Sequence, residues 1–281
     1  MQHCCIFPPT PYTKKGLATV IHTKGGMFML SGIKKSFLIA LGVAILVSFM
    51  ASFAFAASEK DVVAVAASIH ECTNELAYQF EKQGLGKAPE VVSGASGKLA
   101  SQIMAGAPFG LFLSASPEWT KKLEDEGYLY DVYPMATAPV VAWWQKDEPI
   151  TTDTLKNKGL HIAIADPASA PFGKAAVEYL KSIGLYDSLM KEKRLIIMGS
   201  VEQAALAAKS GGADIGIFSL SIAKKLNAGN YVILPIDPLE NSGGLVKGKD
   251  SENLKKFWNY IRSETADEIW KKWGFEPVHS K

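Results

Sequence analysis

The feature that most constrains the fold of this chain is a repeated alternation of short apolar segments with amphipathic ones, joined by turns of small residues. Apolar runs of strand length lie at 61–67, 91–93, 110–113, 161–165, 195–198, 215–218 and 231–235. Segments with helical periodicity lie at about 69–83, from Gly97 onward, and at about 117–126, 173–183 and 201–209. Repeated strand–helix units predict an α/β fold, with mainly parallel sheets flanked by helices.

The 281-residue chain is long enough for two domains of ordinary size. The strand–helix series starts again after an expected strand at Ala138–Trp144, which indicates that the chain enters a second lobe there. We expect an N-terminal extension at 1–56, a first lobe from 57–139 and 236–281, and a second lobe from 140–235. Ligands of open α/β sheets bind at the carboxyl ends of the strands, so the site is expected in a cleft between the lobes.

The end of the chain is expected to be helical. One apolar stripe at helical spacing is formed by Leu254, Phe257, Trp258 and Ile261. Thr265 and Glu268 have the spacing of a capping box, which predicts that a last helix begins there.

The N-terminal segment has the parts of a secretory signal peptide. Lys34 and Lys35 precede an uncharged run from Phe37 to Ala57, which contains the small-residue sequence Ala54-Phe55-Ala56. Cleavage after Ala56 would leave 225 of the 281 residues. The alternative is an uncleaved membrane anchor, because the run is long enough to span a bilayer. In either case we expect the folded part outside the cytoplasm, and we expect translation to start at Met27 or Met29.

Charge and cysteine content exclude two classes of protein. Residues 1–56 contain five lysines and no acid, so the remainder holds 25 basic and 28 acidic residues, a formal charge of −3. That remainder lacks the basic excess of a nucleic-acid-binding protein. Cys72 is its only cysteine, so it is not a disulfide-stapled domain. Cys72 repeats with Leu76 and Phe80 at helical spacing and is expected in the core.

The stretch Glu90–Ile103, EVVSGASGKLASQI, resembles a nucleotide-binding P-loop but does not fit one. A P-loop needs four residues between its glycines and a hydroxyl after its lysine. Here two residues separate Gly94 from Gly97, and Leu99 follows Lys98. The turn between a strand and a helix is nevertheless suited to a smaller anion.

Five strand-to-helix turns share this character. They are Ala66-Ala67-Ser68, Ser93 to Gly97, Pro171-Phe172-Gly173, Gly199-Ser200-Val201 and Phe218 to Ser221. Each offers hydroxyls or free amides at a helix N-terminus, where partial positive charge favours an anion. Each serine alone is more simply explained as a helix N-cap. Five such turns at the same edge of two sheets would together form an anion site.

Three segments resemble the molybdate-binding periplasmic proteins of bacterial molybdate ABC transporters. They are VAVAASIHECTNELAYQFEKQG, VSGASGKLASQIMAGAPFGLFLSAS and IADPASAPFGKAAVEYL, and the closing DEIWKKWGF resembles the last helix of that family. The resemblance extends from about Val62 to Phe275. It implies a two-lobed periplasmic-binding-protein fold of type II, in the periplasm, with molybdate or tungstate as ligand, no cofactor, no catalytic activity and a monomeric state. The implied partners are a membrane permease and its ATPase.

The resemblance also implies the ligand set. Hydroxyls of Ser68 and Ser96 and the backbone amides of Phe172 and Val201 would hold the oxyanion without any cationic side chain. Many members add a tyrosine hydroxyl after a later strand, and this chain has Ser219 there. Ser219 is the fifth candidate ligand, but its shorter side chain leaves open whether it reaches the anion.

Three alternatives remain open at this stage. A carrier of another oxyanion, such as sulfate, would use the same turns. A ferric-ion carrier would use tyrosines, but Tyr130, Tyr133 and Tyr231 are not at the turns. A secreted hydrolase using Ser68 and His70 lacks the G-x-S-x-G nucleophile turn, and we expect His70 to be a solvated residue of the first helical turn. No histidine has ligand spacing for a bare metal ion.

Overall fold

The computed structural model describes residues 61–278, which lie within one compact unit spanning 59–281. The predicted signal peptide and the cleavage site after Ala56 lie outside the described residues. Among the residues that are described, none of the helices is both long and apolar enough to cross a bilayer.

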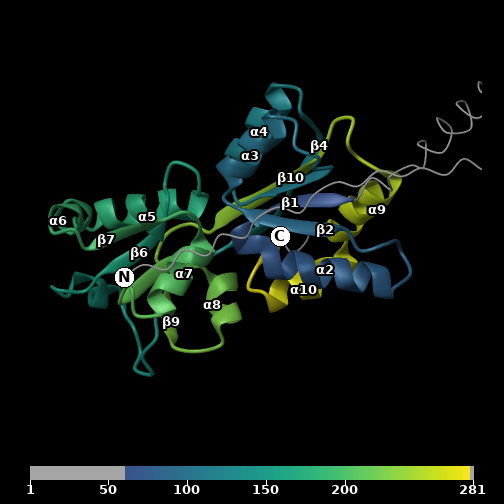
Figure 1. Cartoon of the computed structure of the whole chain (residues 1–281). Helices are drawn as coiled ribbons and strands as arrows, with labels where there is room; N and C mark the ends of the chain where they lie inside the picture. Colours follow the sequence, from purple (N-terminus) through teal and green to yellow (C-terminus); the bar gives the residue numbers. More distant parts are fainter. Residues whose placement is uncertain (1–60, 279–281) are drawn as a thin grey trace, which may run out of the picture. The chain divides into compact units, whose positions relative to one another are not determined.

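The first sheet has six strands in the order β11-β4-β10-β3-β1-β2 (Figure 1). These strands are β1 (Val62–Ala66), β2 (Glu90–Gly94), β3 (Leu111–Ser114), β4 (Leu129–Ala138), β10 (Leu239–Val246) and β11 (Glu276–Pro277). β1 pairs in parallel with β2 and β3, whereas β10 pairs antiparallel with β3 and β4. This sheet and its helices are called lobe 1 below.

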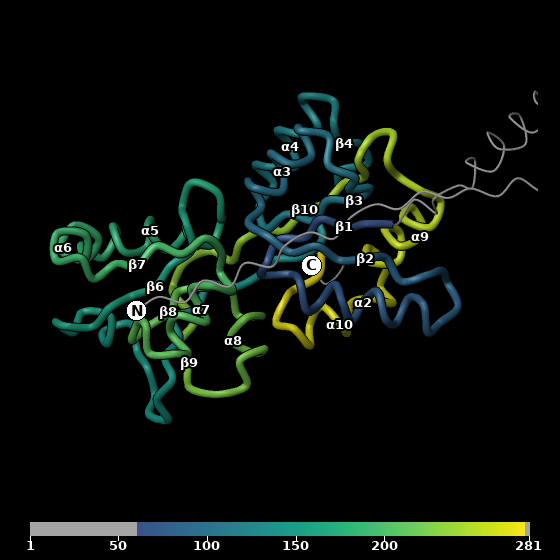
Figure 2. The backbone as a smooth tube through the Cα atoms, viewed as in Figure 1, coloured from purple at the N-terminus to yellow at the C-terminus, as the bar shows by residue number. Residues whose placement is uncertain are grey.

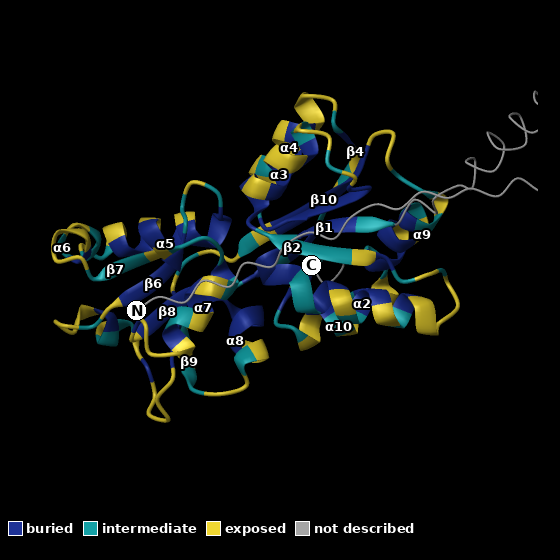
Figure 3. Ribbon diagram, viewed as in Figure 1, coloured by how far each residue is buried: buried dark blue, intermediate teal, exposed yellow. Residues whose placement is uncertain are grey.

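Helices cover both faces of the first sheet. They are η1 (Ala67–Ile69), α2 (His70–Lys82), α3 (Ser96–Met104), α4 (Pro117–Asp125), α9 (Glu252–Ile261), η3 (Glu264–Ala266) and α10 (Asp267–Lys272). Successive side chains of β1 point to opposite faces of the sheet. Ala64 packs with α3 and α4 on one face, and its neighbours Val63 and Val65 belong to the core that includes α2, α9 and α10 on the other. In Figure 3 the strands β1 and β10 are mostly dark blue, the edge strand β2 is teal and yellow, and the outer faces of the helices are yellow.

The second sheet has five strands in the order β7-β6-β8-β5-β9. These are β5 (Val140–Trp144), β6 (Ile162–Ala165), β7 (Leu195–Met198), β8 (Ile215–Ser219) and β9 (Asn230–Ile233). Its helices are η2 (Thr152–Lys156), α5 (Pro171–Ser182), α6 (Tyr186–Lys191), α7 (Val201–Lys209) and α8 (Leu220–Leu226). Ala163 packs with Ala204 of α7, and its neighbours Ile162 and Ile164 face the other way, into the core that includes α5. This sheet and its helices are called lobe 2.

The backbone tube in Figure 2 shows two crossings between the lobes. The chain leaves lobe 1 between β4 and β5, at Pro139, and returns between β9 and β10. Each lobe therefore has its own strand–helix series. The carboxyl ends of β1 and β2 face lobe 2, so the strand-to-helix turns that follow these strands lie where the lobes meet.

The predicted α/β fold class is confirmed, with one correction to the sheets. Both sheets are mixed, because β4, β5, β9, β10 and β11 all pair antiparallel. The strand β10 was not expected from the sequence, because its Asn-Ser-Gly-Gly centre lacks apolar alternation. Gly243 is required there, since a Cβ atom would lie 2.9 Å from the Phe112 carbonyl oxygen of the adjacent strand.

The predicted capping box at Thr265 and Glu268 is wrong. Thr265 lies inside η3, and α10 follows directly with Ala266 at its N-cap and no side-chain cap. The preceding 3-10 turn supplies the start of the helix, so no capping side chain is needed. The predicted core position of Cys72 is confirmed, and burial raises the pKa of its thiol well above the ordinary value.

Candidate functional site

Four of the five predicted turns meet at one small cavity between the lobes. Its lining comes from three segments of lobe 1 and two of lobe 2: 66–68, 94–96, Ala115, 170–172 and Val201. The cavity has a volume of about 10 Å³, which is the room that about one water molecule needs. None of the residues that line it carries a charged side chain.

Lobe 1 contributes two serine hydroxyls to this cavity. Ser68 lies in η1, at the end of β1, and is 3% exposed; its Oγ has no hydrogen-bond partner among the described residues. Ser96 is the first residue of α3 and is 1% exposed. Its Oγ accepts a hydrogen bond from the amide of Ala115 at 3.2 Å, which leaves its proton free for donation.

Lobe 2 contributes two helix N-termini. Phe172 follows Pro171 in the first turn of α5, and Val201 is the first residue of α7. Amides at these positions have no acceptor within their own helix, and the helix dipole adds partial positive charge. Gly173 allows α5 to start close to β6, because a Cβ atom there would lie 2.2 Å from the Ala165 carbonyl oxygen.

The fifth candidate, Ser219, does not line the cavity. It is fully buried at the N-cap of α8, where its Oγ accepts a hydrogen bond from the Ile222 amide at 3.4 Å. The side chain that extends from this turn toward lobe 1 is Ser221, whose Oγ donates to the Ser68 carbonyl oxygen at 2.5 Å. Sequence reasoning included Ser221 in the turn but did not single it out.

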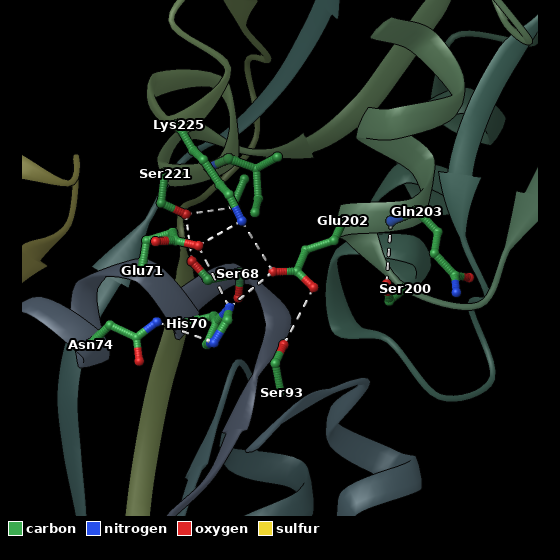
Figure 4. A network of polar contacts seen from close by, with 12 residues as sticks. Ser68, His70, Glu71, Asn74, Ser93, Ser200, Glu202, Gln203, Ser221 and Lys225 are labelled. Atoms are coloured by element: carbon green, nitrogen blue, oxygen red, sulfur yellow. Dashed lines mark hydrogen bonds and ion pairs between the residues drawn. The ribbon is translucent and has the colours of Figure 1, made fainter. Parts of the chain in front are cut away.

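Direct contacts close lobe 1 against lobe 2 around the cavity. The Gly97 amide of α3 donates to the Ser169 carbonyl oxygen at 2.9 Å. On the surface, Lys174 Nζ lies 3.0 Å from Glu118 Oε2. Figure 4 shows a second polar cluster, in which Glu202 of α7 reaches across to lobe 1.

This cluster corrects the expectation that His70 is simply solvated. His70 Nδ1 lies 3.2 Å from Glu202 Oε1, because α2 and α7 begin on opposite sides of the interface (Figure 4). The hydrogen bond from His70, together with the charge of Lys225, lowers the pKa of Glu202. Ser93 adds a longer contact to Glu202 at 3.4 Å. Since His70 is engaged with Glu202 and Ser68 Oγ has no partner, the structure does not assemble the hydrolase pair.

The same cluster contains a group of possible metal ligands. One ligand atom from each of His70, Glu71 and Glu202 can be chosen so that all lie within 4.8 Å of one another. Lys225 Nζ, however, lies 2.6 Å from Glu71 Oε1 and 3.6 Å from Glu202 Oε1. The ammonium group already supplies the positive charge between these carboxylates, so the cluster is an ion-pair network joining the lobes.

Comparison with known proteins identifies the family of this chain. The model of the bacterial extracellular solute-binding protein family matches residues 62–276. A molybdate-binding protein of Rhodobacter capsulatus is 32% identical over 230 residues, which cover 78% of this chain and 89% of that protein. The solved periplasmic molybdate-binding protein of Azotobacter vinelandii is 30% identical, with a TM-score of 0.72 over 77% of this chain and 98% of that one.

A solved sulfate-binding protein of Mycobacterium tuberculosis is 19% identical, with a TM-score of 0.64 over 78% of this chain and 86% of that one; it shares the fold alone. The family match covers nearly all of the described residues, and two relatives that are each 32% identical, from Rhodobacter capsulatus and Azotobacter vinelandii, are molybdate-binding proteins. The chain therefore belongs to the bacterial extracellular solute-binding proteins, in the group of the molybdate-binding proteins.

Proposed function

We propose that this chain is the solute-binding component of an ABC transporter and captures molybdate or tungstate between its lobes. The observation that carries the proposal is the unpartnered Ser68 hydroxyl, buried in a cavity that Ser96 and the N-termini of α5 and α7 also line. The proposed ligand set is Ser68, Ser96, Phe172 and Val201. Ser219 is proposed to contribute without touching the anion.

The chemistry of these donors selects for a fully ionised tetrahedral anion. Molybdate, tungstate and sulfate are dianions that only accept hydrogen bonds at neutral pH, whereas phosphate still carries a proton in part. A site built only of donors leaves that proton facing another donor, which costs about 1–3 kcal/mol. Discrimination between molybdate and the smaller sulfate then depends on how far the cavity opens.

The anion is larger than the water-sized cavity of the structure, so the walls must separate to admit it. We propose that lobe 1 (57–139 and 236–281) and lobe 2 (140–235) move about the two chain crossings, as in other hinge-closing proteins. Because no lysine or arginine lines the cavity, the anion is not held by a full charge and can be released. The receiver is proposed to be a membrane permease driven by its ATPase.

The remaining parts of the proposal follow from the family and from the signal-peptide pattern of the N-terminal segment. The protein acts in the periplasm as a monomer after cleavage behind Ala56, and it performs no catalysis. Retention of residues 37–57 as a membrane anchor is the alternative to cleavage. Mass spectrometry of the N-terminal peptide of the exported protein decides between the two.

Isothermal titration calorimetry of the exported protein tests the function. We expect saturable binding of one molybdate or tungstate per chain and no saturable binding of phosphate. Ser182→Ala, an exposed serine on α5 outside the cavity, is the matched control and should bind like the wild type. Absence of saturable molybdate and tungstate binding would refute the proposal, and displacement of molybdate by equimolar sulfate would favour a sulfate carrier.

A further inference from the structure

We propose that Ser221 is a positioning residue: from lobe 2 it holds the backbone of the turn that presents Ser68, and so stabilises the closed, anion-bound arrangement. This inference rests on the proposed function. It assigns a role to a residue that does not line the cavity.

The direction of each hydrogen bond follows from the chemistry of the groups. The Ser68 carbonyl can only accept, so Ser221 must donate its single hydroxyl proton across the 2.5 Å contact. The Oγ atoms of Ser219 and Ser221 are 2.8 Å apart. Because the proton of Ser221 is already engaged, Ser219 donates to Ser221. Ser219 in turn accepts from the Ile222 amide.

The result is a series of three hydrogen bonds in which each group donates to the next, from the Ile222 amide through Ser219 and Ser221 to the Ser68 carbonyl oxygen. While it is intact, Ser219 has no proton left for an anion, which explains how Ser219 can matter without being a ligand. The three serines are 0%, 4% and 3% exposed, respectively. Hydrogen bonds in such a dry environment polarise one another and are costly to break singly.

The last acceptor of this series of hydrogen bonds, the Ser68 carbonyl oxygen, determines what the series does. The carbonyl belongs to Ser68 itself, so holding it fixes the peptide plane that follows the Ser68 Cα atom. The direction of the Ser68 side chain into the cavity is thereby restricted. Ser68 is in lobe 1 and Ser221 in lobe 2, 153 residues apart in sequence, so separation of the lobes breaks this bond.

Closure of the lobes and orientation of the Ser68 hydroxyl are therefore linked through one uncharged hydrogen bond, from Ser221 to the Ser68 carbonyl oxygen. When the lobes close, Ser221 binds the carbonyl oxygen of Ser68, and the anion binds the hydroxyl of the same residue. We expect the bond to oppose reopening, so its loss should speed release of the anion more than it slows capture.

Stopped-flow fluorescence with molybdate on the exported protein tests this. Ser221→Ala should raise the dissociation rate constant roughly 5- to 100-fold and change the association rate constant by less than about threefold. The melting temperature of the anion-free protein should change little, because the open form exposes these groups to water. Ser221→Thr, which keeps a hydroxyl, should restore slow release.

Two further variants separate positioning from general stability. Ser219→Ala should have a smaller effect than Ser221→Ala, because Ser221 can still donate to Ser68. The release rate of the double variant should match that of Ser221→Ala alone, since Ser219 reaches Ser68 only through Ser221. Additive losses, or a Ser221→Ala loss accompanied by an equal loss of anion-free stability, would contradict the role.

Wild-type protein that binds molybdate, with Ser221→Ala releasing it at the wild-type rate, would overturn this inference alone. Wild-type protein that binds neither molybdate nor tungstate would overturn the proposed function, and the inference with it.

Discussion

Replacing Ser68 with alanine separates a ligand role from a structural one, because the two make opposite predictions about stability. The Ser68 hydroxyl has no hydrogen-bond partner within the protein, so it contributes no protein hydrogen bond to the anion-free state, whether the lobes are closed and bury it or are open and expose it to water. Removing an unsatisfied buried polar group is neutral or stabilising. The melting temperature of anion-free Ser68→Ala should therefore equal or slightly exceed that of the wild type.

Binding should change in the other direction. A hydrogen bond to a charged group contributes about 1.5–3 kcal/mol, and about 1.4 kcal/mol corresponds to a factor of ten in Kd. Loss of the Ser68 donor should therefore raise the Kd for molybdate roughly 10- to 150-fold. Calorimetric titration gives the affinity, and thermal unfolding by circular dichroism without anion gives the stability.

A specific result would refute this reasoning. If Ser68→Ala binds molybdate as tightly as the wild type, its hydroxyl does not face the anion. If affinity and anion-free stability fall together, Ser68 stabilises the fold and its unpartnered state in the closed arrangement has another cause. Ser182→Ala, measured alongside, corrects for any general effect of removing a serine hydroxyl.

Four further outcomes are expected from other parts of the molecule. Ser96→Ala should weaken molybdate binding by about 1–3 kcal/mol and, unlike Ser68→Ala, should also lower the anion-free melting temperature, because it leaves the buried Ala115 amide without its acceptor. Glu202→Gln should speed molybdate release. In the wild type the pKa of Glu202 is lowered, so the stabilising contribution of its carboxylate is present above the ordinary carboxyl pKa and is lost as the pH falls through the folded-state pKa. A pH series of release rates measures this loss. Lys174→Met should change the Kd by less than about fivefold, because exposed ion pairs contribute about 0–1 kcal/mol. Cys72 should resist thiol reagents until the protein unfolds, since it is buried and its thiol pKa is raised, as a colorimetric thiol assay can show.

Local sequence patterns predicted the strand–helix units well. Helices end where Gly84 and Gly127 adopt positive φ angles of 71° and 79°, as expected for glycine at a helix C-terminus. Strand β10 was missed because its pairing with β3 and β4 is set by distant strands, and Gly243 has no apolar side chain to reveal it.

The residues of the site divide in the same way, into those that local sequence patterns indicate and those whose contacts depend on residues distant in the sequence. The turns that contain Ser68, Ser96, Phe172 and Val201 were predicted because each joins a strand to a helix, whereas the choice of these four residues as ligands came from the family resemblance; all four line one cavity. Ser221 and the pair His70–Glu202 were missed because their partners lie 153 and 132 residues away. Which of the two serines of this turn, Ser219 or Ser221, faces lobe 1 depends on the orientation of α8, which no local pattern encodes.

We propose that uncharged donors from both lobes hold one tetrahedral dianion. Crystals of the exported protein grown with molybdate, measured at the molybdenum absorption edge, test it most directly. We predict a single anomalous peak in the cavity, with its oxygens hydrogen-bonded to the hydroxyls of Ser68 and Ser96 and the amides of Phe172 and Val201. A peak elsewhere, or a lysine or arginine side chain bound to the anion, would contradict the account.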